Sequence, residues 1–263
     1  MHLPVFHVDA FTSRAFAGNP AAVCPLSAWL DDGLLRLVAA ENNLSETAFF
    51  VPQGDFYDLR WFTPRCEVKL CGHATLASAF VIMQILAPKV EFVRFRTRSS
   101  GELTVCRDGE LLAMNFPLLP PWKCAKPPDQ LLRALPKPAA SVWQIEDNYF
   151  AVYDSPKDIG EIRPDLHLLE KLHPFGVAIT APGEDCDFVS RYFAPSYGIP
   201  EDPVTGSTHC SLAPYWAERL GKKKLHARQL SERGGELWCE VEEKRVILKG
   251  NAVLMLRGEL LLH

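Results

Sequence analysis

The sequence lacks the patterns that would tie it to a membrane or to nucleic acid. Its longest apolar run, 74–87, is too short to cross a bilayer and contains Gln84. The net charge is −4 and the basic residues are dispersed, which leaves no electrostatic footprint for nucleic acid. Residues 1–4 lead straight into a strand-like segment and do not resemble a signal peptide. We therefore expect a cytoplasmic protein that binds neither membranes nor nucleic acid.

Paired cysteines and metal-ligand spacings are also missing. None of the eight Cys residues forms a C-x-x-C pair, and no two His residues have a spacing typical of metal ligands. Reduced thiols in a cytosolic protein are the simplest explanation. The sequence predicts no metal site and no cofactor.

The chain is organised around the segment 201–209, which precedes an apolar run at 210–220. Pro203 stiffens a turn, Gly206 allows close approach of the backbone, and Ser207 or Thr208 can act as the N-cap of a helix. The exposed N–H groups of such a helix start, together with the positive end of the helix dipole, suit a small anion. An ordinary capped helix without a ligand is the alternative.

A second copy of this pattern stands earlier in the chain, at 67–75, before the apolar run 76–86. Matching positions that lie 134 residues apart are Glu67 and Glu201, Gly72 and Gly206, Ala79 and Ala213, and 101–103 and 235–237. An aromatic pair, with a proline two residues on, precedes each copy. A shared offset across scattered identities indicates an internal duplication.

Strand-like alternation surrounds both apolar helices. In the first half it appears at 5–11, 59–62, 90–98, 103–107 and 111–116, and the second half repeats the scheme. The proline-rich stretch 117–138 has the composition of a linker. The pattern predicts an α+β fold with two pseudo-symmetric lobes, 1–117 and 118–263, each a curved, mostly antiparallel sheet around one central helix.

Several long motifs, in order along the chain, carry a resemblance to a known family. They are 18–20, 44–49, 59–64, 71–77, 201–207 and 233–237. Over essentially its whole length the chain resembles the phenazine biosynthesis-like (PhzF-like) family. The resemblance implies the diaminopimelate-epimerase-like fold, an active site in the cleft between the lobes, and a homodimer. It also implies cofactor-free isomerisation of a small carboxylate, which in characterised members is a dihydro-hydroxyanthranilate.

The resemblance also assigns roles to particular residues. Glu46 matches the general acid/base, and His73 and Asp202 match two further catalytic positions. The matching substrate-binding positions are Asn19, Ser45, Gly72, Gly206 and Ser207. By residue type alone, Glu46 could be a surface carboxylate, His73 a backbone partner and Asp202 a turn cap. Because a helix N-terminus lowers a histidine pKa, we expect His73 to be neutral.

Two other functions stay open. Amino-acid epimerases of the same fold place a thiol at each helix start; Cys71 occupies the first of these positions, but Thr205 occupies the second. A hydroxyl is too weak an acid to replace a thiol, which argues against two-thiol racemisation. The other alternative is a non-catalytic protein that binds a metabolite or partner in an inherited cleft. Such a protein has no need of the Glu46 carboxyl among aromatic residues.

Overall fold

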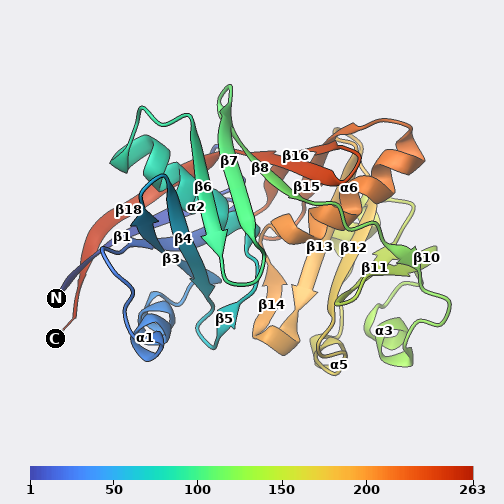
Figure 1. Cartoon of the computed structure of the whole chain (residues 1–263). Helices are drawn as coiled ribbons and strands as arrows, with labels where there is room; N and C mark the ends of the chain where they lie inside the picture. The colour runs from blue at the N-terminus through green and yellow to red at the C-terminus, as the bar shows by residue number, and fades with distance from the viewer. Residues whose placement is uncertain (263) are drawn as a thin grey trace. The chain divides into compact units, whose positions relative to one another are not determined.

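A computed structural model gives the structure of the protein and describes residues 1–262 (Figure 1). The packing of the chain divides it into two compact units. Unit 1 contains Met1–Phe116 and the chain from Ile247 onward, and unit 2 contains Pro117–Val246. No helix within residues 1–262 is long and apolar enough to cross a membrane.

The end of the chain belongs to the first unit and not, as the sequence suggested, to the second lobe. Strand β18 (Ala252–Leu261) pairs antiparallel with β1 (His2–Ala10), and the two lie side by side in Figure 1. The expected lobe 118–263 is therefore corrected. Backbone hydrogen bonding decides the partner of a strand, and its place along the chain does not reveal that partner.

Unit 1 is a mostly antiparallel sheet with two helices. Its further strands are β2 (Asn19–Pro25), β3 (Glu46–Gln53), β4 (Phe56–Phe62), β5 (Glu67–Val68), β6 (Phe92–Thr97), β7 (Glu102–Asp108) and β8 (Leu111–Pro117). Its helices are α1 (Asp32–Asn42) and α2 (Gly72–Val81), and α2 continues into a π-helical turn, η1 (Ile82–Leu86). Asp31 caps α1 by accepting a hydrogen bond from the Gly33 N–H, and Asn43 ends it in the left-handed conformation.

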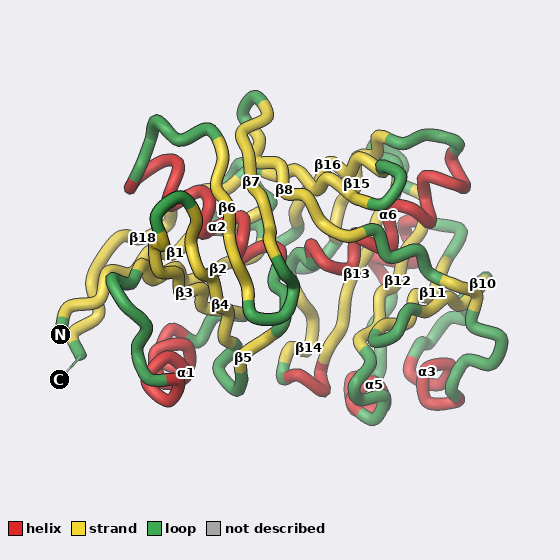
Figure 2. The backbone as a smooth tube through the Cα atoms, viewed as in Figure 1, coloured by secondary structure: helices red, strands yellow, loops and turns green. Residues whose placement is uncertain are grey.

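Helix α2 is buried along almost its whole length. It packs against β1, β2, β3 and β18 of its own unit (Figure 2). Its two buried hydroxyls are satisfied within the helix, because Thr75 donates to the Cys71 carbonyl and Ser78 to the Ala74 carbonyl. A helix that is apolar on nearly all faces is therefore enclosed by sheet, as its sequence predicted.

Unit 2 repeats this construction. Its strands are β9 (Trp122–Lys123), β10 (Ser141–Gln144), β11 (Asn148–Val152), β12 (Gly176–Pro182), β13 (Phe188–Ala194), β14 (Ile199–Asp202), β15 (Lys224–Gln229) and β16 (Gly235–Val241), and β17 (Arg245–Gly250) contains the boundary with unit 1. Its helices are α3 (Asp129–Ala134), α4 (Pro156–Glu161), α5 (Leu166–Glu170), α6 (Gly206–Leu220) and the 3₁₀ turn η2 (Pro195–Tyr197). The expected linker is part of this unit, because Leu131 and Ala134 of α3 are buried in its core.

The two units share one order of strand pairings. In unit 1, β2–β3 is parallel, β3–β4 and β4–β5 are antiparallel, α2 follows, and then β4–β6 is parallel and β6–β7 antiparallel. Unit 2 has the same order in β11–β12, β12–β13, β13–β14, α6, β13–β15 and β15–β16. Thr47 faces Phe62 in the first unit as Val177 faces Phe193 in the second. Thr47 and Val177 are therefore equivalent positions, and so are the residues before them, Glu46 and Gly176.

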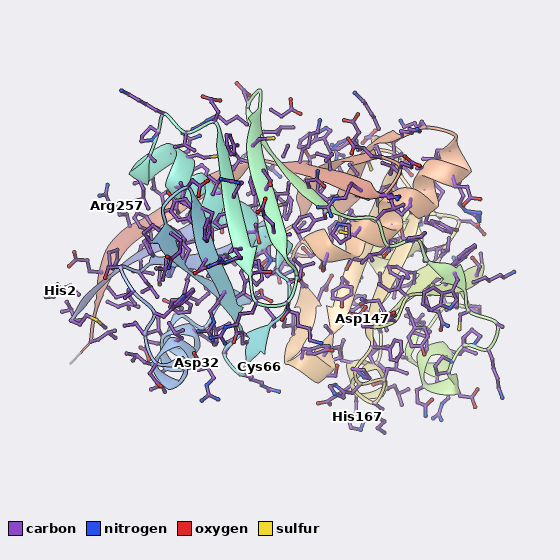
Figure 3. The ribbon with its side chains drawn as sticks, viewed as in Figure 1. His2, Asp32, Cys66, Asp147, His167 and Arg257 are labelled. Atoms are coloured by element: carbon purple, nitrogen blue, oxygen red, sulfur yellow. The ribbon has the colours of Figure 1, made fainter. Side chains whose placement is uncertain are left out.

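A buried arginine holds the strand that leads to α2. Arg60 of β4 donates two hydrogen bonds of 2.8 Å to the Glu67 carboxylate on β5, and its guanidinium lies over the Phe62 ring. It also donates to Asp32, which Figure 3 labels at the start of α1. Two-point pairing with a planar guanidinium fixes direction as well as distance, so β5 enters the turn before α2 in one orientation.

Unit 2 contains the matching device before α6. Arg191 of β13 donates hydrogen bonds of 2.7 and 2.8 Å to the Glu201 carboxylate on β14, with its guanidinium over Phe193. The same side chain donates to the carbonyls of Ile159 and Ile162, which ties the end of α4 to the sheet. Arg191 therefore joins three segments of unit 2 at one buried point.

Candidate active site

The starts of β3 and α2 bring together the two predicted catalytic residues of unit 1. Glu46 is the first residue of β3 and His73 the second residue of α2. Glu46 Oε2 lies 3.2 Å from His73 Nε2, and the two residues are only 8% and 4% exposed. A surface position for Glu46, the alternative that residue type left open, does not agree with this burial.

Asn19 and Cys71 lie on the other edge of the imidazole. Asn19 Nδ2 is 3.1 Å and Cys71 Sγ 3.5 Å from His73 Nδ1. Asn19 opens β2, which lies between β1 and β3, and it is fully buried. Of the other candidates, Gly72 is the buried first residue of α2, and Ser45 is half-buried directly before β3. All the candidates of unit 1 thus lie at or beside the first residues of β2, β3 and α2.

The pKa of His73 is shifted in the direction opposite to the sequence-based expectation. Burial by itself lowers its pKa, but the neighbouring Cys71 and Glu46 outweigh burial and hold the pKa of His73 well above its ordinary value of 6.5. This direction is opposite to the lowered pKa expected from the sequence, because Cys71 and Glu46 both lie against the ring. Burial raises the pKa of the Cys71 thiol to about 11. The imidazole of His73 thus lies between the carboxyl group of Glu46 and the thiol of Cys71.

One oxygen of this pair is left without a hydrogen bond. Among residues 1–262, nothing donates a well-aligned hydrogen bond to Glu46 Oε2, although the oxygen is buried. It lies 3.2 Å from His73 Nε2, close enough for electrostatic attraction between the two side chains. A buried carboxylate oxygen with unused lone pairs is able to accept a proton or bind a cation.

In unit 2, Asp202 stands at the end of β14 beside Thr205, the N-cap residue of α6. The Thr205 hydroxyl donates a short hydrogen bond to Asp202 Oδ2. Gln229 holds both: its Oε1 accepts from the Thr205 N–H at 2.9 Å, and its Nε2 donates to the Asp202 carbonyl at 2.7 Å. In the two-cysteine epimerases this position holds a thiol. Here it holds the Thr205 hydroxyl, which already donates to the Asp202 carboxylate.

Sequence reasoning missed Gln229. The signal that could have found it is its place in β15, where Leu225, Ala227 and Gln229 alternate inward and are all buried. A polar amide at the third inward position of such a strand needs a buried partner. Its partner is the turn before α6.

Neither helix start is capped by a side chain. Helix α6 begins at Gly206, so Ser207 lies inside its first turn and does not serve as the N-cap that the sequence suggested. Thr205 of α6 and Cys71 of α2 occupy the N-cap positions, and neither makes a side-chain capping hydrogen bond. No capping side chain therefore occupies the first N–H groups of either helix, and these groups can bind a ligand.

A buried histidine supports the unit 2 turn from within α6. Nδ1 of His209 lies 2.8 Å from the Thr205 carbonyl, to which it donates, and its ring lies beside Phe188. Burial lowers the pKa of His209 to about 4. This histidine is therefore neutral at ordinary pH.

The depressed pKa of His209 makes stability depend on pH. An unfolded chain binds the His209 proton near pH 6.5, whereas the folded protein binds it only near pH 4, so this stability is complete above pH 6.5 and is lost as pH falls toward 4. Between pH 7 and pH 4, we expect wild type to lose about 3 kcal/mol more unfolding free energy than His209→Asn. Denaturant unfolding at both pH values measures the difference, and equal losses in the two proteins would refute it.

Among residues 1–262, one group of side chains has metal-binding atoms close to one another. The group consists of Glu46, Cys71 and His73. One ligand atom from each lies within 4.8 Å of the others. Spacing along the chain gave no sign of it, since β3 supplies the carboxylate and α2 the other two donors. Cys71 Sγ lies nearer Nδ1 than Nε2 of the ring, however, whereas Glu46 lies at Nε2, so the three side chains as placed do not surround one ion.

Known proteins resemble the chain over nearly its whole length. The family model described as "Phenazine biosynthesis-like protein" matches residues 8–258. An uncharacterized isomerase of Pseudomonas aeruginosa is 53% identical over 260 residues, 99% of each chain. The crystal structure of a PhzF-family phenazine biosynthesis protein from Enterococcus faecalis covers 100% of both chains with a TM-score of 0.94 and 43% identity.

A more distant structure shares the fold alone. The probable proline racemase from Agrobacterium radiobacter K84 has a TM-score of 0.66 at 12% identity, over 99% of this chain and 93% of its own. The predicted α+β, epimerase-like fold is confirmed. The chain belongs to the phenazine biosynthesis-like family and is an isomerase of that family.

Proposed function

We propose that this isomerase moves a proton on a small, cyclic carboxylate by general acid/base catalysis, with Glu46 taking and returning the proton. The observation that carries the proposal is the buried Glu46 Oε2, which has no aligned hydrogen bond and lies 3.2 Å from the His73 imidazole. A carboxyl group held this way exchanges a proton with a bound substrate atom without first breaking a hydrogen bond of its own.

His73 supports this role electrostatically. Its raised pKa keeps an imidazolium beside Glu46, which stabilises the carboxylate after each proton is given up. Asn19 lies against the other ring nitrogen, and a half-turn of its amide lets its oxygen accept from Nδ1–H of an imidazolium and fix the orientation of the ring. We assign both residues to the site, with Glu46 as the group that touches the reacting atom.

The two units allow the position of Glu46 to be compared with its equivalent in the second unit. From the shared order of strand pairings and the shared sequence offset, we infer that the chain is an internal duplication. The second unit has Gly176 at the position equivalent to Glu46, where a Cβ atom would stand 2.0 Å from the Tyr192 hydroxyl oxygen. A side chain there would displace the Tyr192 and Asn148 side chains. A single base that removes and returns a proton suits a proton shift, whereas inversion of a stereocentre calls for two bases.

The two alternative functions, an amino-acid epimerase and a non-catalytic binding protein, are therefore less favourable. The Thr205 hydroxyl already donates to Asp202, which supports the argument against an epimerase that uses two thiols. A binding protein gains nothing from a buried ion pair, since the desolvation of such a pair can exceed its attraction.

We propose that Asp202, Gly206 and Ser207 contact the substrate, through the turn and the uncapped N–H groups of α6. A homodimer is part of the proposal and is carried from the family.

Deuterium exchange tests the proposal. The protein is incubated in heavy water with dihydro-hydroxyanthranilate, other unsaturated cyclic carboxylates and L-proline, and mass spectrometry follows the label. We expect one deuterium per molecule in at least one unsaturated carboxylate, and no D-proline. Exchange in none of the carboxylates would contradict proton transfer, and formation of D-proline would favour the epimerase.

A further inference from the structure

We infer that Trp61 is a substrate-binding residue, and that its indole N–H donates a hydrogen bond to an oxygen on the ring of the substrate. The substrate class that follows is a cyclic carboxylate that also carries a ring hydroxyl or carbonyl group. The inference deepens the proposed function, and it rests on that function for the place of the reacting atom at Glu46. The buried indole donor is a feature of the structure alone.

The indole N–H of Trp61 is a buried donor without an acceptor. Trp61 lies in β4 and is 1% exposed, and among residues 1–262 nothing accepts a hydrogen bond from its Nε1. A buried indole N–H normally has a partner, because an unpaired donor has lost its water without compensation. Trp216 has the usual arrangement, since its Nε1 donates to Thr180 Oγ1 at 3.0 Å. A ligand that offers an oxygen to Trp61 supplies the partner that this donor lacks.

Strand register places this indole on the same face of the sheet as Glu46. Trp61 stands directly opposite Ala48 of β3, and Glu46 precedes Ala48 by two residues. Because side chains alternate between the two faces of a strand, these three share one face, whereas Phe49 and Phe62 pack in the core on the other face. Diagonal neighbours of this kind lie about 7–8 Å apart at Cα, within reach of an aromatic side chain.

Unit 2 indicates how far an aromatic residue at this position reaches. Tyr192 is the residue equivalent to Trp61, and it stands opposite Ala178 of β12. Its hydroxyl oxygen lies 2.0 Å from the point where a Cβ of Gly176 would stand, and it donates to Asn148 Oδ1 at 2.6 Å. The tyrosine therefore extends over the position that corresponds to the proposed base and ends on a polar partner in the next strand.

The acceptor that satisfies the aromatic residue in unit 2 has no counterpart in unit 1. Asn148 is the parallel-strand neighbour of Gly176, and the equivalent neighbour of Glu46 is Ala21. A methyl group accepts no hydrogen bond, so the missing acceptor is an oxygen of the ligand. Trp61 Nε1 and Glu46 Oε2 are then a donor and an acceptor on one face, both without a hydrogen bond among residues 1–262. A ligand that gives an oxygen to the first and a proton to the second satisfies both.

A ring oxygen should therefore decide which cyclic carboxylates bind well. A site built around a buried donor discriminates against an analogue that lacks the matching oxygen, because the donor then stays unpaired. Hydroxyanthranilate and anthranilate are a matched pair of probes, since they differ by one ring hydroxyl and, being aromatic, have no proton shift to undergo. Their binding can be measured whether or not the protein is catalytically active.

NMR of the indole N–H groups tests the contact in the full chain. In protein labelled on the indole nitrogen of tryptophan, the cross-peak of Trp61 is the one that is missing from Trp61→Phe. We expect hydroxyanthranilate to move the Trp61 indole proton of wild type downfield, as a new hydrogen bond does, and anthranilate to leave it in place. The cross-peak of Trp216 is the internal control, because that indole is already hydrogen-bonded and should not respond.

Affinities separate a hydrogen bond from packing of the ring. Trp61→Phe keeps an aromatic ring without the N–H, and should bind hydroxyanthranilate about 10-fold more weakly than wild type but anthranilate within about two-fold. Trp29→Phe is the matched control, since Trp29 is a half-buried residue of the same unit that lies beside Arg60 on the other face, and its affinities should equal those of wild type. Circular dichroism shows whether each variant keeps its fold.

A Trp61 cross-peak that stays in place at saturating hydroxyanthranilate would overturn the inference. Equal weakening of both compounds by Trp61→Phe would overturn it too, because the indole would then only pack, and so would the absence of hydroxyanthranilate binding. The cross-peak shift is measured on wild type, so it does not depend on the stability of a variant. A shift with hydroxyanthranilate, but no deuterium exchange in any carboxylate, would count against the proposed function and leave the indole contact standing.

Discussion

Glu46→Gln is expected to lower the rate of solvent deuterium exchange by about 10²–10⁴-fold, the usual contribution of a positioned acid or base. Glutamine has the size of glutamate but does not take up a proton near neutral pH. Because it removes the charge beside His73, the substitution should also bring the pKa of His73 down. Mass spectrometry of exchange, with the best substrate of the panel, measures the rate, and the NMR titration of His73 measures the second effect.

The matched control for this experiment is Glu41→Gln. Glu41 is an exposed residue of α1 in the same unit, and its substitution should leave exchange unchanged. Unfolding of both variants by denaturant shows whether either has lost its fold. Exchange by a folded Glu46→Gln protein at the wild-type rate would remove Glu46 from the proposed mechanism.

Arg191→Met is expected to lower the free energy of unfolding by about 3–5 kcal/mol, the usual result of removing one partner from a buried ion pair. Methionine keeps much of the apolar stem and donates no hydrogen bond. The substitution leaves the Glu201 carboxylate and the carbonyls of Ile159 and Ile162 without their guanidinium donor. Denaturant unfolding at neutral pH measures the loss.

Arg228→Met is the control for this second prediction. Arg228 also pairs with a glutamate of unit 2, Glu236, through a hydrogen bond of 3.0 Å, but its side chain is 38% exposed. A solvated pair of this kind contributes at most about 1 kcal/mol. If both substitutions cost the same, burial of the Arg191 pair does not stabilise unit 2 as argued.

Much of the candidate site could be predicted because it depends on short motifs. The segments 44–49 and 71–77 each supplied one half of the Glu46–His73 pair, and the helix starts could be predicted from glycine and a following apolar run. Gln229 could not be found in this way, because its partners are Asp202 and Thr205 and the hydrogen bonds cross from β15 to the turn before α6. The raised pKa of His73 was not predicted either: Cys71 stands two residues away in the sequence, but the Glu46 carboxyl group comes from another element.

The sequence by itself determined the family, the α+β pattern, the shared offset of the two halves and the identity of the acid/base candidate. These are properties of local pattern and of order along the chain. Tertiary structure alone decided that the last strand pairs with the first, that Leu131 and Ala134 of the expected linker belong to a core, and that a thiol and a carboxyl group lie beside one imidazole. Each of these depends on pairing between distant strands or on packing around a helix, where the free energy of burial and hydrogen bonding selects partners that sequence separation does not reveal.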